Sequence, residues 1–229
     1  MSASPRTARS IGWLYLSMVL PAPFNLVYIP SRFIVSGDAA ATAANINASE
    51  LTFRFGILSG LITNALFIAL AVALYGWLKD VDRVQARLLL MFAAVGAILG
   101  LGNLLNEIAP LILLSGANYL APFSRTQLES LAYGILRLRS QGMSVEMAFW
   151  GLWLFPFGVL VIKSRFIPKW IGIALIVGCF AWLAESFTGI LFPASRGLVD
   201  QIMTPLYSVG ELSMVGWLLW KGGKIPLPG

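Results

Sequence analysis

The fold of this chain is decided by one stretch, Leu88 to Leu114, which reads LLLMFAAVGAILGLGNLLNEIAPLILL. It exceeds the roughly 20 apolar residues that a helix needs to cross a hydrocarbon core of about 30 Å. Yet it carries Asn103, Asn106 and Glu107 close together, and polar or charged groups at membrane depth cost free energy. We therefore expect a membrane-spanning helix whose polar side chains face other protein rather than lipid.

Composition extends this interpretation to the whole chain. Hydrophobic residues make up 58% of the 229 residues and charged residues 11%, whereas about a quarter of a soluble domain is charged. Helices and closed barrels are the structures that satisfy all backbone polar groups in lipid, and long unbroken apolar runs favour helices over the alternating segments of a barrel. The sequence thus predicts an all-α, polytopic membrane helix bundle.

Apolar runs predict six transmembrane helices within a single domain, residues 1–229. The long first and third outer loops are expected to be partly helical, because Asp38 is placed to cap an Ala-rich stretch and Leu128, Leu131 and Leu138 recur at helical spacing. The first run is expected to be a retained helix rather than a cleaved signal, since it is long and contains Pro21. The expected spans cover residues 11–30, 55–78, 88–114, 145–162, 170–192 and 203–220.

Basic residues predict the orientation. Ten of the sixteen lie on the predicted inner side, and cytoplasmic loops carry such an excess. Both termini are therefore expected to be cytoplasmic. No clustered basic stripe with interleaved aromatic residues is present, so the high pI does not indicate nucleic-acid binding. The ten residues are Arg6, Arg9, Lys79, Arg83, Arg87, Lys163, Arg165, Lys169, Lys221 and Lys224.

Four stretches resemble a known family. Residues 30–57 read PSRFIVSGDAAATAANINASELTFRFGI, residues 104–124 LLNEIAPLILLSGANYLAPFS, residues 149–178 FWGLWLFPFGVLVIKSRFIPKWIGIALIVG, and residues 210–222 GELSMVGWLLWKG. In this order they resemble the bacterial membrane-protein family known as domain of unknown function 4386. The resemblance implies a multi-helix bacterial membrane protein with no established activity, and we expect it in the bacterial cytoplasmic (inner) membrane. It also implies a histidine in many members where this chain has Gln141, so no histidine-dependent role is carried over.

Catalytic motifs are missing from the sequence. The chain has no histidine and one cysteine, Cys179, so haem ligation, His-bound zinc and Cys-His or Ser-His catalysis lack the necessary residues. No phosphate-binding loop, GxSxG or HExxH motif is present. We expect no cofactor, leave open whether a metal binds, and consider an enzyme less favoured than a binding protein.

The acidic residues carry the prediction of a site. Glu107, Glu146, Glu185 and Glu211 fall one each in the third to sixth predicted spans. The rise of 1.5 Å per residue places them in the outer half or middle of the bilayer. Asn103 lies one turn before Glu107, on the same helix face. Polar residues of the other spans complete the candidate set: Asn25, Asn64 and Ser208.

Less specific interpretations remain open for several of these residues. Glu146 could reach the outer headgroups or pair with Arg139, seven residues earlier. Asn106 lies off the face of Asn103 and Glu107, and it could bond a neighbouring helix for packing alone. A kink at Pro110 would keep Glu107 within the bilayer.

Three classes of function follow. Carboxylates that share a low-dielectric site cannot all ionise unless a cation neutralises them. The first hypothesis is therefore an outward-facing acidic pocket, with Glu107, Glu185 and Glu211 around one cavity, that binds a proton, a cation or a cationic small molecule for transport. The second is an intramembrane enzyme with glutamates as general acid and base on a lipid-like substrate. The third is an accessory or assembly subunit. The expected partner in every case is the lipid bilayer, and the oligomeric state is left open.

Overall fold

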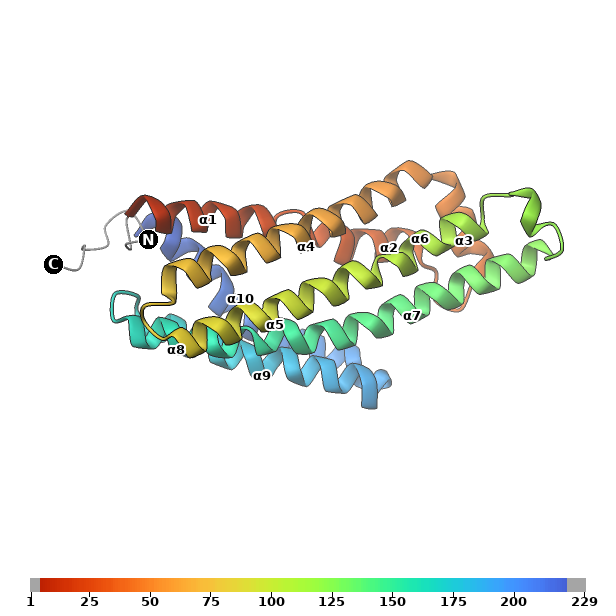
Figure 1. Cartoon of the computed structure of the whole chain (residues 1–229). Coiled ribbons are helices and arrows are strands. Elements are labelled where there is room, and N and C mark those ends of the chain that lie inside the picture. The colour runs from red at the N-terminus through yellow and green to blue at the C-terminus, as the bar shows by residue number, and fades with distance from the viewer. Residues whose placement is uncertain (1–4, 222–229) are drawn as a thin grey trace.

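The computed structural model describes residues 5–221, and over these residues the chain is all-helical. The first five elements are α1 (Pro5–Val19), the π-helical turn η1 (Phe24–Tyr28), α2 (Ile29–Phe33), α3 (Ala39–Ala48) and α4 (Glu50–Leu78). The others are α5 (Arg83–Asn103), α6 (Leu105–Leu113), η2 (Asn118–Leu120), α7 (Arg125–Leu152), α8 (Leu154–Ser164), α9 (Lys169–Leu191), η3 (Pro193–Ser195) and α10 (Arg196–Trp220). The long helices run side by side in one bundle (Figure 1).

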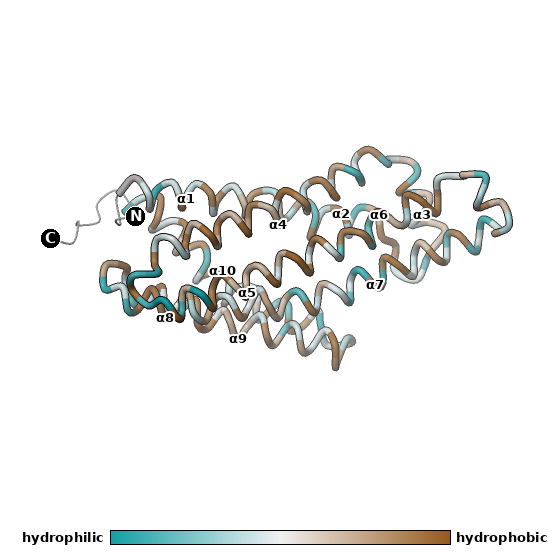
Figure 2. Tube along the Cα trace, in the orientation of Figure 1, coloured by the Kyte–Doolittle hydropathy of each residue, from teal (hydrophilic) through white to brown (hydrophobic). Residues whose placement is uncertain are grey.

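Among the described residues, five helical stretches are long and apolar enough to cross a membrane: Thr7–Phe33, Glu50–Leu78, Arg83–Leu113, Arg125–Ser164 and Lys169–Leu191. Hydrophobic residues follow α4 and α5 along much of their length (Figure 2). The apolar helices indicate a membrane protein. The predicted count of six is not confirmed, because the segment expected at 203–220 lies in α10 but is not among these stretches. Polar residues such as Thr204 and Ser208 lower its hydropathy.

Three of the long helices are interrupted. α1 ends at Val19, just before Pro21 and Pro23, and α7 ends four residues before Pro156. Proline lacks the backbone N–H and its ring clashes with the carbonyl four residues earlier, so both breaks follow from the sequence. The remaining break, the second in chain order, is at Leu104, between α5 and α6. Pro110 itself lies inside α6, six residues after this break, and the kink expected there stays a prediction.

At the end of the bundle away from the two termini, the helices extend beyond the predicted spans. The third loop, expected to be partly helical, forms the first part of α7 and continues without a break into the fourth span. Ser124 and Gln127 form a capping box at the start of this helix. Asp38 caps α3 through the backbone N–H of Ala41, as predicted. An apolar cluster, including Phe33, Ile46, Phe53, Leu111 and Leu136, packs α2 and α3 over α4, α6 and α7. These elements cover one end of the bundle.

The opposite end gathers the loops that carry the predicted cytoplasmic cations (Figure 1). Arg9 near the start of α1 donates to the carbonyl of Leu219 near the end of α10 (3.3 Å). Lys163 pairs with Asp82 across two loops (2.6 Å), and this hydrogen bond holds the pKa of the Asp82 carboxyl below its usual range. The side chains of Arg6 and Lys224 lie outside the described residues. The others share one end, as the positive-inside rule requires of cytoplasmic loops.

This shared end leads to a prediction about topology. Reporter fusions to either terminus should be active in the cytoplasm, because the cation-rich end is expected to face inward. A cysteine replacing the exposed Asn47 at the end of α3 should react with a membrane-impermeant maleimide in intact cells. The buried Cys179 should stay unlabelled in the parent chain. A C-terminal fusion that is active only outside the cytoplasm would contradict this orientation.

Candidate functional site

A cavity of about 410 Å³ lies inside the bundle, at the level of the three helix breaks. Pro23 at the first break, Leu104 at the second and Trp153 at the third all line it. Aromatic rings form much of its wall, from Phe67, Trp150, Trp153, Trp182 and Tyr207. The polar residues of the lining are Asn25, Thr63, Asn64, Asn103, Glu107, Arg139, Glu146, Ser208 and Glu211.

A closed set of hydrogen bonds joins Asn25, Glu107 and Arg139. Arg139 Nε donates to Glu107 Oε1 at 2.7 Å, and Arg139 Nη2 donates to Asn25 Oδ1 at 3.0 Å. Asn25 Nδ2 in turn donates to Glu107 Oε2 at 2.9 Å. Glu107 is 2% exposed and Arg139 7%. The guanidinium therefore compensates the charge of Glu107 in a buried setting, where an unpaired charge would be costly.

Local backbone geometry brings Asn25 into this set. Asn25 belongs to the π-helical turn η1, and it is the buried residue of that turn. The facing helix α4 has Gly60 at the contact, where a Cβ atom would meet the side chains of Leu104 and Asn25. π-helical turns often occur at functional sites. A widened turn opposite a glycine therefore directs this amide into the core.

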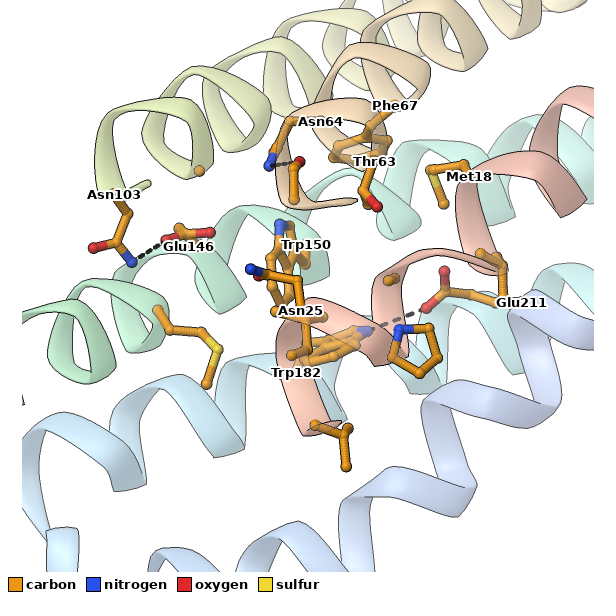
Figure 3. A pocket seen from close by; sticks show the side chains of 18 of the residues that line it. Met18, Asn25, Thr63, Asn64, Phe67, Asn103, Glu146, Trp150, Trp182 and Glu211 are labelled. Carbon is orange, nitrogen blue, oxygen red and sulfur yellow. Dashed lines mark hydrogen bonds between the residues drawn. The ribbon is translucent and has the colours of Figure 1, made fainter. Parts of the chain in front are cut away.

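Asn103 connects the buried ion pair to Glu146. Its amide Nδ2 donates to the backbone carbonyl of Arg139 (2.9 Å) and to Glu146 Oε1 (Figure 3). Its Oδ1 accepts from Asn106 Nδ2 (2.8 Å). Gly142 on α7 provides the space, because a Cβ atom there would meet the Asn103 side chain. Asn106 on α6 therefore orients Asn103 across the break between α5 and α6.

Glu211 belongs to a separate aromatic cluster. Tyr15 Oη donates to Glu211 Oε2 at 3.0 Å, and Trp182 Nε1 donates to Oε1 at 3.2 Å. The Trp182 ring stacks on Tyr207, with a centroid separation of 3.8 Å, and meets Trp150 edge to face at 5.4 Å. These donors fix the carboxylate in place without cancelling its charge, because both are neutral.

The comparison with known families identifies the family of the chain. The profile of the family described as Domain of unknown function (DUF4386) matches residues 10–222. The chain belongs to this family. No curated protein and no solved structure matched the chain. Gln141, where the resemblance implies histidine in many DUF4386 members, is exposed on α7 and does not line the cavity.

Seven of the residues predicted from the sequence line the cavity of this DUF4386 member: Asn25, Asn64, Asn103, Glu107, Glu146, Ser208 and Glu211. Glu185 does not. It follows Trp182 by about one turn of α9 and lies near Arg196 and Asp200, where its Oε1 has no hydrogen-bond partner. The structure thus brings Glu146 to the cavity in place of Glu185. That any of these residues binds a ligand stays a prediction.

Arg139 was missed as a site residue because it was assigned to an outer loop. In the structure, Arg139, Met143, Glu146 and Trp150 follow one another at intervals of four, three and four, and all line the cavity. This heptad spacing was readable in the sequence, provided that α7 was taken as continuous. Within the described residues, no group of three or more His, Cys, Asp or Glu side chains is placed to hold a metal ion.

Proposed function

We propose that the cavity binds a small organic cation. One observation carries the proposal: Glu146 and Glu211 face the same cavity, and neither forms an ion pair with a described residue. Arg139 is the one cation among the lining residues, and Glu107 and Asn25 take up its guanidinium. The lining thus holds three carboxylates and one cation. A bound cation would compensate the remaining charge.

The size and walls of the cavity favour an organic cation over a proton or a bare metal ion. A volume of about 410 Å³ falls within the range of small-molecule pockets, about 300–1,000 Å³. Indole and phenol rings attract an ammonium group through their π faces. The carboxylates would orient such a ligand while the rings contact its apolar part.

The three breaks support transport as the purpose of binding. Transporters often bind their substrates between discontinuous helices near the middle of the membrane. Here α1, α5–α6 and α7–α8 are each interrupted at the cavity. Segments on the two sides of a break can tilt separately, which would open the cavity toward one face of the membrane at a time. We therefore include movement of the bound cation across the inner membrane in the proposal.

A matched pair of probes tests binding. Hexylammonium should raise the melting temperature of the detergent-solubilised protein by about 5 °C or more near saturation, whereas the neutral hexanol should not. Glu146→Gln combined with Glu211→Gln should remove this effect. Glu50→Gln changes an exposed glutamate outside the cavity, and it should retain the response. Equal responses to amine and alcohol, or an unchanged response in the double variant, would refute cation binding.

A further inference from the structure

The two uncompensated carboxylates lie at different places in the cavity. Figure 3 shows Glu146 beside Asn103 at one side and Glu211 at the other, with Trp150 and Trp182 between them. Glu146 is on α7 and Glu211 on α10. Asn103 holds the first, and Tyr15 and Trp182 hold the second. Each carboxylate thus has its own set of neutral donors.

The space between the carboxylates has an apolar wall. The edge-to-face contact of Trp150 and Trp182 and the stack of Trp182 on Tyr207 form one continuous aromatic surface. Phe67 adds another ring to the lining. An alkyl chain gains free energy by leaving water for such a surface. A charged or strongly polar group there would be desolvated without compensation.

A ligand with a single charge leaves this site incompletely neutralised. One ammonium group can approach Glu146 or Glu211, and the other carboxylate then stays without a cation. Each carboxylate retains the capacity to accept another hydrogen bond, because Glu146 Oε2 accepts none from a described residue and each Glu211 oxygen accepts one. Two ammonium groups would satisfy both ends of the cavity.

We propose that the ligand is a dication whose two ammonium groups are separated by an apolar spacer, as in an α,ω-diamine. One group binds at Glu146 and the other at Glu211, and the spacer lies along Trp150 and Trp182. This inference rests on the proposed function and specifies its ligand class. Linking two binding groups makes the second contact intramolecular, so a diamine of matching length binds more tightly than either group alone.

The test compares linear diamines with monoamines of the same carbon number, from four to ten carbons, by isothermal titration in detergent. At one chain length the diamine should bind at least about tenfold more tightly than the monoamine. Glu146→Gln and Glu211→Gln should each abolish this preference, and Glu50→Gln should retain it. Glu211→Asp retains the carboxylate but holds it one methylene length closer to the α10 backbone, so the preferred diamine should become longer.

The outcomes separate this inference from the proposed function. Equal affinity for diamines and monoamines would overturn the dication and leave cation binding intact. Failure of all amines to bind would overturn both. Two results would overturn the assignment of one ammonium group to Glu146 and the other to Glu211. One is a diamine preference that persists in Glu146→Gln, and the other is an unchanged preferred diamine length in the folded Glu211→Asp variant. Monodispersity and the melting temperature without ligand establish that each variant is folded.

Discussion

Replacing Arg139 with Met should lower the free energy of unfolding by about 3–5 kcal/mol, because it leaves the Glu107 carboxylate buried without its cation. The two side chains are 8% and 3% exposed, and their ion pair measures 2.7 Å. Asn25 bonds to both partners and would lose one of its contacts. Unfolding by titration with a denaturing detergent in mixed micelles measures the loss.

A surface pair of the same length provides the control. Arg54 and Glu50 also meet at 2.7 Å, but their side chains are 55% and 50% exposed. Exposed pairs contribute at most about 1 kcal/mol, so Arg54→Met should have little effect. Adding Glu107→Gln to Arg139→Met should recover much of the loss, since no buried charge then remains unpaired. Similar losses for Arg54→Met and Arg139→Met would show that the buried pair has no special role.

The helical fold was predictable because each long apolar run predicts a helix independently of the others. Errors in where a run begins or ends therefore do not change the prediction of a helix bundle. The sixth span is not confirmed, because α10 carries Thr204, Ser208 and Glu211 within its apolar sequence. Two of these, Ser208 and Glu211, line the cavity. Polar residues that define the site are thus among those that weaken the hydropathy signal of this helix.

The site was predictable only in part, because spacing within one helix assigns residues to a face, whereas a depth counted from the helix end does not allow for helix tilt. Asn103 and Glu107 could be assigned to one face by their spacing, and they line one cavity. Glu185 was assigned by depth, but α9 presents Trp182 to the cavity and Glu185 about one turn beyond it. Assigning Arg139 to the site required knowledge that α7 runs continuously from Arg125 to Leu152.

The α8–α9 contact depends on two facing glycines. A Cβ atom on Gly158 would lie 2.5 Å from the carbonyl oxygen of Gly172, and one on Gly172 would lie 2.7 Å from that of Gly158. Both are closer than Cβ atoms approach backbone, so any larger residue forces the helices apart. Small residues allow this close approach, which supplies much of the packing energy between helices in membranes.

We expect Gly158→Leu to lower the free energy of unfolding by about 3 kcal/mol, near the upper end of the usual cost of overpacking, because backbone rather than a flexible side chain blocks the new atoms. Since α8 begins at the break that lines the cavity, the displacement should also weaken hexylammonium binding. Gly216→Leu is the matched control, because Gly216 on α10 is exposed and a Cβ atom added there would meet no neighbouring element within 4 Å. It should leave the stability unchanged or raise it by up to about 1 kcal/mol through helix propensity. Equal stability of the two leucine variants in the mixed-micelle titration would mean that the α8–α9 contact can adjust, and that close glycine packing does not hold the third break in place.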